Sequence, residues 1–327
     1  MEKSDRSLLG KISWLYYIDG LTQKEIGQRV GLSRLKVVRL LQRARAEGVV
    51  EINIAPDLLL NTELARSLED RFRLHEAIIT EPVNQPDNGE AIGRAGARFL
   101  ERVLRDDMAL GIGMGRTIAS LLPHIPSRKL NNVTVRTLAG AYEEPGRETN
   151  AYNISWRLAD QLDAVVEPLH CPLIVTNRAT REALLEDRAL RSVLESLSEC
   201  DLVLIGLGSL DKASPLVRLG YCTPEQLAAL RKKGAVGEIL GRFYSLDGEL
   251  IPSEFDERIL GIDIAQLCQI ASVVALAYGA QKVQPMLGAL RTGCIDVLIT
   301  DRWTAEAILV TQLLKREDDA NRAKSQK

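Results

Sequence analysis

The sequence predicts an α/β protein that joins an N-terminal winged helix-turn-helix to a larger domain with a doubly wound, mainly parallel sheet. Two observations predict this class. A basic segment near the N-terminus has helix-turn-helix spacing, and from residue 76 onward short apolar runs alternate with amphipathic helical stretches. The 327 residues, with 42 basic and 44 acidic side chains, are typical of a globular protein of about two domains.

Several classes are disfavoured at once. No apolar run approaches the roughly 18 residues of a membrane span, and the first residues lack a signal-peptide pattern. Five scattered cysteines without a CxxC pair argue against both a disulfide framework and a zinc site. We therefore expect a cytoplasmic protein with no membrane partner and no metal.

The charge is distributed unevenly along the chain. Between residues 22 and 45 seven basic residues face Glu25 alone, namely Lys24, Arg29, Arg34, Lys36, Arg39, Arg43 and Arg45. Because the whole chain has a net charge of −2, the remainder carries −8. A basic N-terminal segment on an acidic body indicates a negatively charged partner such as DNA, although a solvated helix face would look the same by charge alone.

Apolar spacing favours the DNA-binding interpretation of this segment. Over residues 23–42, Ile26 and Val30 lie four apart on a first helix, and Val37 and Leu40 lie three apart on a second. Gly27 permits close approach of the helices, and Gly31 can end the first one with a positive φ. Thr22 with Glu25 has capping-box spacing, and Ser33 is the expected N-cap of the second helix.

The expected DNA contacts lie at the start of each of these helices. If the second helix enters a major groove, the candidate contacts are Thr22, Gln23, Ser33, Arg34, Lys36 and Arg39. Arg34 ranks first for base recognition and Lys36 for phosphate contact. An earlier helix over 6–19 would complete a three-helix unit, and residues 48–54 would form a short strand of the wing.

A connector follows Pro56. Leu60, Leu64, Leu68 and Phe72 recur at helical spacing, so this stripe needs a partner, which is either the large domain or a copy in a second subunit. A dimer is expected because operators usually repeat with the two-fold symmetry of the protein.

The large domain reads as alternating strands and helices. Apolar runs predict strands over 77–80, 108–112, 133–138, 173–175, 202–206, 272–277 and 296–300. Helices are expected between them, over 89–104, 117–122, 150–162, 188–197, 224–233, 281–291 and 304–314. This alternation predicts a parallel sheet whose ligands bind beyond the carboxyl ends of its strands.

Three strand ends carry chemistry. The stretch 109–117 runs into Gly113, Gly115, Arg116 and Thr117, a pattern that can hold a phosphate without metal, although a plain turn is as plausible. At the second strand end, Gly208 and Ser209 follow the strand over 202–206 and are placed for a ligand. The third place is the pair of strand ends after residues 277 and 300. There Lys282 at a helix start suggests an anionic ligand, whereas an aspartate in the position of Asp301 is most often an N-cap.

Catalysis has little support. His75, His124 and His170 lie in no metal-binding or nucleophile-elbow context, and no GxSxG is present. Carboxylates such as Glu238, Asp247 and Asp301 exist, but a base without an identified acid or cofactor is weak evidence. We expect no catalytic residue and no cofactor.

Four blocks together resemble the SorC-type family of sugar-responsive bacterial transcriptional regulators, in the SorC/DeoR group. The likeness is carried by WLYYIDGLTQKEIGQRVGLSRLKVVRLL at 14–41, LGIGMGRT at 110–117 and the segments 218–248 and 273–309. It covers roughly residues 10–312, and the N-terminal block is similar to regulators of polyol operons such as erythritol catabolism. The resemblance implies an operator-binding N-terminus and an effector-binding domain with the fold of phosphosugar isomerases.

The resemblance also implies an effector site. Gly113, Gly115, Arg116 and Thr117 match the family's phosphate-side loop, Glu238 an acidic position that binds sugar hydroxyls, and Lys282 a basic effector contact; Asn150 is a further polar candidate. The chain departs from the family where Tyr278–Gly279 replaces a Gly-Gly pair, and at Glu238, where Asp is frequent. Both departures bear on pocket size.

We therefore expect a transcriptional regulator, a repressor of a carbohydrate or polyol operon controlled by a small phosphorylated sugar or polyol, in a homodimer or homotetramer. The expected domains are residues 1–55 for DNA binding, 56–75 for a linker or oligomerisation helix, 76–315 for effector binding and 316–327 as a polar tail. The alternatives are an isomerase-like sugar-phosphate enzyme with a DNA-binding appendage, and a protein whose large domain serves only oligomerisation.

Overall fold

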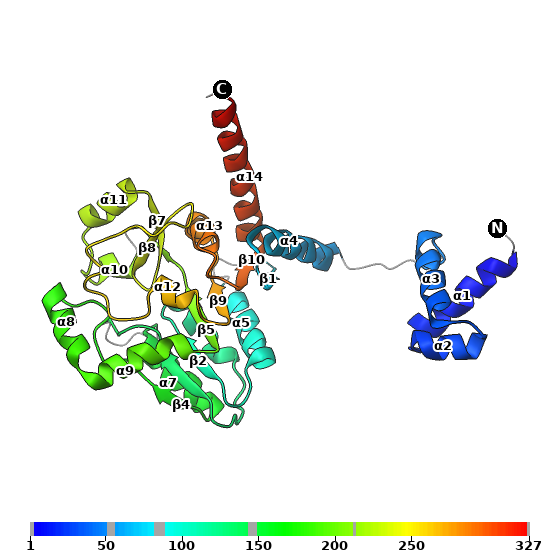
Figure 1. Ribbon diagram of the computed structural model, residues 1–327, viewed down its shortest axis with the longest axis horizontal. Helices are drawn as coiled ribbons and strands as arrows, with labels where there is room; N and C mark the ends of the chain where they lie inside the picture. Colours follow the sequence, from blue (N-terminus) through cyan, green and yellow to red (C-terminus); the bar gives the residue numbers. More distant parts are fainter. Residues whose placement is uncertain (1–2, 51–55, 82–88, 143–148, 212–213, 326–327) are drawn as a thin grey trace. The chain divides into compact units, whose positions relative to one another are not determined.

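The computed structural model describes residues 3–50, 56–81, 89–142, 149–211 and 214–325, and it divides into two compact units, Met1–Leu59 and Leu60–Lys327 (Figure 1). In the described part of the chain, no helix is long and apolar enough to cross a bilayer. The two units are described separately below.

The first unit is a three-helix bundle. Its helices are α1 (Lys3–Tyr17), α2 (Gln23–Val30) and α3 (Arg34–Ala46). Apolar residues at helical spacing face inward, and the buried ones come from all three helices: Leu9, Ile12, Leu15, Ile26, Val37, Leu40, Leu41 and Ala44. This confirms the expected pair of helices and the earlier helix that completes the unit.

Local capping fixes where these helices begin and end. The Thr22 hydroxyl accepts from the Glu25 backbone N–H at 3.3 Å, and the Glu25 carboxylate accepts from the Thr22 N–H at 2.8 Å, which is a complete capping box. Gly31 ends α2 with a φ of 69°, and Ser33 caps α3 by accepting from the Lys36 N–H. All three capping expectations are confirmed.

The expected wing is only partly within the described residues. Gly48 has a φ of 68° and residues 48–50 form a turn and bend rather than a strand, while residues 51–54 lie outside the described part of the chain.

The second unit contains a seven-stranded sheet in which all neighbouring strands run parallel (Figure 1). The order across the sheet is β1 (Glu76–Thr80), β10 (Val297–Asp301), β9 (Val273–Leu276), β5 (Leu202–Gly206), β2 (Ala109–Ile112), β3 (Thr134–Thr137) and β4 (Val165–Glu167). The chain therefore winds outward in opposite directions from the β2–β5 pair, which confirms the doubly wound α/β class.

Alternating side chains on the strands build two cores, one on each face of the sheet. In β5, Leu202 and Leu204 join the core formed with α5 (Gly89–Val103) and α7 (Ala151–Leu162). Val203 and Ile205 instead join the core formed with α13 (Val283–Arg291) and α14 (Arg302–Ser325). Strands buried on both faces read as continuous apolar runs, which is why the sequence showed them.

Shorter elements complete this unit. They are α6 (Arg116–Ala119), α8 (Arg178–Glu186), α9 (Arg188–Ser196), α10 (Pro215–Arg218), α11 (Pro224–Lys232), α12 (Ile264–Leu267) and the single 3₁₀ turns η1 (Leu122–His124), η2 (Leu197–Glu199) and η3 (Ala280–Lys282). A three-stranded antiparallel sheet joins β6 (Gly208–Ser209), β7 (Ala235–Ile239) and β8 (Arg242–Ser245).

The connector helix α4 (Pro56–Phe72) packs on the large unit. Leu68 is fully buried in the core that contains α13, and Ala65 and Phe72 pack against the same core. The Arg302 Nε at the start of α14 donates to the Asn61 side chain at 2.9 Å. Of the two partners expected for the α4 stripe, the large domain therefore covers its inner side.

In the second unit the strands differ from expectation in three places. Residues 173–175 form no strand of the main sheet, since Ile174 makes only an isolated bridge with Ile259. This segment is apolar because Leu173, Ile174 and Val175 are buried although they lie outside the main sheet. Strand β4 was not expected, because it is three residues long and its Val165 is 63% exposed. The antiparallel sheet was not expected either.

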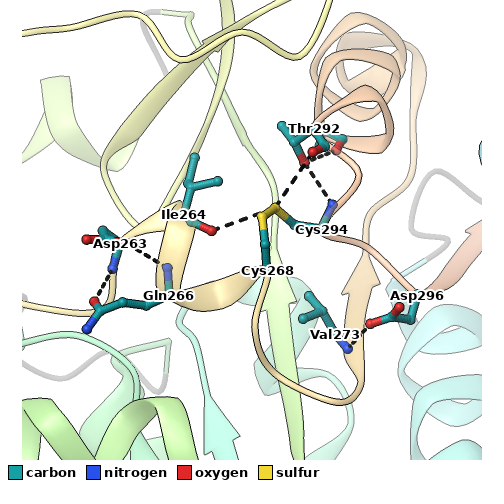
Figure 2. The surroundings of a disulfide bond; sticks show 9 residues. Asp263, Ile264, Gln266, Cys268, Val273, Thr292, Cys294 and Asp296 are labelled. Atoms are coloured by element: carbon teal, nitrogen blue, oxygen red, sulfur yellow. Dashed lines mark hydrogen bonds between the residues drawn. A yellow bond between two sulfur atoms is a disulfide. The ribbon is translucent and has the colours of Figure 1, made fainter.

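Cys268 and Cys294 form a disulfide bond, with their Cα atoms 4.3 Å apart (Figure 2). The expectation of no disulfide is wrong for this pair. The fold brings the two residues together from 26 positions apart, at the end of α12 and in the turn after α13, and spacing alone does not reveal that approach. Cys171, Cys200 and Cys222 are free, and burial raises the pKa of the Cys200 thiol to about 11.

Gly27→Ala should loosen the helix-turn-helix unit. A Cβ at this position would lie 2.6 Å from the Leu32 carbonyl oxygen, so backbone must move, at a cost of about 1–3 kcal/mol. Faster hydrogen exchange in peptides covering residues 3–50, without change in the second unit, is the expected result. Gly10→Ala is the control, because a Cβ there meets nothing within 4 Å and the change favours helix α1. Unchanged exchange in Gly27→Ala would contradict the close approach.

Candidate functional site

A cavity of about 340 Å³ opens at the carboxyl ends of β2 and β5, where the winding of the sheet reverses. Three parts of the chain supply most of its walls: the loop Met114–Thr117 after β2, the segment Gly206–Asp211 after β5, and the start of α13 with Gln281 and Lys282. Further lining residues come from the segment before and through α10 and from the antiparallel sheet: Ser214, Pro215, Leu216, Arg218, Glu238, Leu240 and Gly241.

The loop after β2 supplies a helix start and two polar side chains. Gly115 has a φ of 114°, a conformation that favours glycine, and it precedes α6 without a side-chain cap. The N–H groups of Gly113 and Gly115 donate to the Leu204 and Thr149 carbonyls, both at 2.8 Å. The loop therefore offers a ligand the first N–H groups of α6 and the side chains of Arg116 and Thr117, rather than those two glycine amides.

A glycine beside β5 makes room for the acidic side chain of the site. Gly208 in β6 pairs with Glu238 in β7, and a Cβ on Gly208 would occupy the space of the Glu238 carboxylate. The Glu238 Oε2 accepts from the Gly241 N–H at 2.7 Å, which holds one oxygen in place. The carboxylate thus lies on the pocket wall with its position set by the antiparallel sheet.

Lys282, which precedes α13, also lines the pocket. Its Nζ donates to the Leu207 carbonyl at 2.7 Å and to the Ser209 Oγ at 3.3 Å, and the Ser209 hydroxyl donates to Asp211 at 2.6 Å. These contacts tie the lysine to the segment after β5. The pocket lining therefore includes three cations, Arg116, Arg218 and Lys282, and two carboxylates, Asp211 and Glu238.

Burial shifts both central charges toward their neutral forms. Burial raises the pKa of Glu238, an effect that the Gly241 N–H and Lys282 oppose. It also lowers the pKa of Lys282, against the attraction of Glu238 and Asp211, and Arg116 adds to the lowering. An anionic ligand beside Arg116 and Lys282 would relieve the repulsion between these two cations.

The structure places the expected effector residues unevenly. Gly115, Arg116, Thr117, Glu238 and Lys282 all line the cavity. Gly113 does not line the cavity, because it is buried against β5. A Cβ on Gly113 would lie only 3.0 Å from the Leu204 carbonyl oxygen. Asn150 lies outside the lining as well, and its amide caps α7 through the Tyr152 N–H while donating to the Tyr142 carbonyl.

Other pocket residues were not singled out from the sequence. Asp211, Ser214 and Arg218 line the cavity, and the buried Ser214 hydroxyl has no hydrogen-bond partner within the described residues. The sequence feature that could have indicated them is a group of polar residues between the strand over 202–206 and Pro215, which starts α10. Tyr278 packs against the core beside α5 and is not part of the lining, so its effect on the pocket is indirect.

A second candidate surface lies on the helix-turn-helix unit. Arg34, Lys36 and Arg39 are exposed on α3, and no carboxylate among the described residues pairs with them. A hollow of about 750 Å³ lies beside the starts of α2 and α3, lined by Tyr16, Tyr17, Gly20, Leu21, Thr22, Gln23, Lys24 and Arg34. The Thr22 and Ser33 side chains are engaged as helix caps, so the groups that these two residues can offer to a ligand at this surface are those of their backbone.

Two other chemical possibilities receive no support from the geometry. Within the described residues no group of three or more His, Cys, Asp or Glu side chains could hold a metal ion. Asp301 is buried and accepts from the Thr304 N–H at 3.0 Å and the Thr304 hydroxyl at 2.7 Å, so it acts as a helix cap.

Comparison with known proteins agrees with this geometry. Residues 57–310 match the family model described as "Putative sugar-binding domain". The chain is 31% identical to the transcriptional regulator LsrR of Klebsiella pneumoniae over 94% of each chain, and 28% identical to the erythritol catabolism regulatory protein EryD of Brucella abortus over 94% of this chain and 98% of that one. The crystal structure of the full-length sorbitol operon regulator SorC from Klebsiella pneumoniae superposes with a TM-score of 0.72 at 28% identity, covering 94% of this chain and all of that one.

The fold, the pocket and these relatives define a transcriptional regulator with a sugar-binding domain rather than an enzyme. The chain belongs to the SorC-type family of sugar-binding transcriptional regulators. The resemblance in the sequence is thereby confirmed, and the enzyme alternative is not supported.

Glu238→Gln should stabilise the ligand-free protein more at pH 8 than at pH 5. The pKa of Glu238 in the folded protein lies above its usual value of 4.5. Between these two pKa values the native state binds more protons than the unfolded state, so the stability of the wild type falls as the pH rises through this interval. The amide does not titrate. Thermal unfolding of both proteins at several pH values checks this, and a stability difference that is independent of pH would contradict the raised pKa.

Proposed function

We propose that this regulator is a DNA-binding repressor of a carbohydrate or polyol catabolic operon, controlled by a small phosphorylated sugar or polyol. One observation carries the choice of effector: the pocket places the cations Arg116 and Lys282 and the Thr117 hydroxyl together with the Glu238 carboxylate, which is held by the Gly241 N–H. A phosphate ester fits the first group and sugar hydroxyls fit the second.

The arrangement of the two groups supports a ligand with two different ends. Arg116, Thr117 and Lys282 would hold the phosphate, and Glu238 would accept hydrogen bonds from hydroxyls. A free polyol is uncharged and would bring no anionic group to Arg116 and Lys282. The names of the relatives EryD and the sorbitol operon regulator support a polyol as the parent compound.

DNA binding is proposed to use the exposed α3 face and the hollow beside it. Thr22, Gln23, Ser33, Arg34, Lys36 and Arg39 are the proposed contacts, with the backbone of the capping residues close to phosphates. This function places the protein in the cytoplasm, with its operator.

A homodimer or homotetramer is part of the proposal. Helix α14 exposes Trp303, Val310 and Leu313, at 70%, 55% and 49%, and α4 exposes Leu60 at 38%. Apolar side chains at this spacing on one helix are suited to a second copy. Residues 56–75 would then join the DNA-binding and effector-binding domains, and effector binding can alter DNA affinity only by the extent to which it discriminates between two states of the assembly.

The test is a titration of the purified protein against its own upstream promoter DNA at fixed salt, with and without a panel of free and phosphorylated sugars and polyols. Specific binding that one phosphorylated compound weakens supports the proposal. Strengthened binding would reverse the sign of regulation, and failure of every sugar to shift thermal stability would favour a large domain used only for oligomerisation.

Arg34→Ala and Lys36→Ala should each weaken operator binding without changing effector affinity. Loss of the Arg34 guanidinium should cost about 1–3 kcal/mol and relax base preference, whereas loss of Lys36 should weaken binding to all sequences. Fluorescence anisotropy at fixed salt measures both. Arg231→Ala, an exposed position in the second unit, is the charge-matched control, and wild-type operator affinity in Arg34→Ala would remove it from the contacts.

Lys282→Ala should leave operator binding intact but abolish the response to the effector. The variant removes a cation from the proposed phosphate site, which should weaken effector affinity by at least about tenfold. Calorimetry and operator release measure the two effects. Lys233→Ala, an exposed lysine outside the pocket lining, is the control, and a normal effector response in Lys282→Ala would refute the proposed role.

A further inference from the structure

Leu35 is a large apolar side chain at the start of α3 that belongs to none of the hydrophobic cores formed by the described residues. It is the second residue of that helix and is 61% exposed, whereas Leu40 and Leu41 of the same helix are buried. Single exposed leucines are common on protein surfaces. Its neighbours give this one meaning, because Arg34 and Lys36 beside it are exposed cations.

Leu35 shares its helix face with polar residues that point away from the core. Positions 35, 39 and 42 recur at i, i+4 and i+7, so Leu35, Arg39 and Gln42 form one outward stripe. All three are exposed, while Val37, Leu40, Leu41 and Ala44 form the buried stripe on the opposite side. Arg43 and Arg45 are held by Glu47 and by Tyr17, so they flank the stripe with their charges engaged.

We propose that Leu35 is a specificity-determining residue that packs against the 5-methyl group of a thymine in the operator. This inference rests on the proposed DNA-binding function and extends it to a residue that charge and capping did not select. The major groove offers an apolar group only at thymine, where the methyl projects beside the O4 acceptor. An exposed leucine on the outward stripe gains contact area there, whereas cytosine or a phosphate offers it no apolar surface.

The stripe also fixes what lies around this contact. Arg39, one turn further along the same face, brings donors that suit guanine, and Gln42 brings an amide that suits adenine. Arg34 lies to the side of the stripe and lines the hollow beside α2. The thymine contact is therefore assigned to Leu35, with Arg39 and Gln42 following it along the groove.

The experiment uses an operator selected by the full-length protein from a random DNA pool. Each thymine of a half-site is then replaced by uracil, which removes only the 5-methyl group. With wild-type protein, one uracil position should weaken binding about fourfold, the amount expected for one buried methyl, and the others should have little effect. Because this measurement needs no protein variant, it does not depend on how a variant folds.

Leu35→Ala supplies the second arm. It should weaken binding to the thymine operator about tenfold, and uracil at the sensitive position should cause little further loss, since the contact is already gone. Ile18→Ala is the matched control, because Ile18 is 65% exposed in the same unit but lies outside α3. It should bind both operators like the wild type.

The outcomes separate this inference from the function on which it rests. If the wild type selects no specific sequence, both fail. If it binds a specific operator but Leu35→Ala binds equally well, or the losses from Leu35→Ala and uracil add in full, the thymine contact is overturned while the regulator stands.

Discussion

The reversal of winding between β2 and β5 is the constraint on which the rest of the large unit depends. Because the paired strands run parallel, their carboxyl ends meet at one edge, and the connections leaving β2 and β5 depart in opposite directions. That divergence opens the cavity between the two loops. The antiparallel sheet closes the cavity with Glu238, and the start of α13 closes it with Lys282. Arg116 and Lys282, which are more than 150 positions apart in the sequence, therefore line the same cavity.

Much of the fold could be predicted from the sequence because its causes are local or periodic. The caps of the helix-turn-helix depend on Thr22, Glu25, Gly31 and Ser33 alone, and fully buried strands such as β5 read as unbroken apolar runs. The segment 173–175 shows the limit of this signal. Burial outside the sheet produces the same apolar run as burial within it, whereas the half-exposed β4 produces none.

The site was predictable only where the family motif and the chemistry coincided. Arg116, Thr117, Glu238 and Lys282 carry charge or polarity at strand and helix ends, and the fold brings them into one cavity. The Gly113 N–H instead donates to the Leu204 carbonyl, and the Asn150 side chain caps α7 and donates to the Tyr142 carbonyl. These partners are distant in the sequence or depend on the local fold, so sequence spacing does not show them. Ser214 could not be predicted as a site residue, because a single serine in the sequence does not show that its hydroxyl is buried in the wall of a pocket.

The pairing of Gly208 with Glu238 links two positions in evolutionary terms. Because position 208 has no side chain, Glu238 can occupy the space beside it, and a Cβ at 208 would force the Glu238 side chain to move. A lineage that gains a side chain at 208 must therefore reposition the acid, at the expense of its contact with the Gly241 N–H, or shorten it. A substitution at 208 thus changes the pocket at 238 as well, and its effect depends on which acid stands there when it occurs.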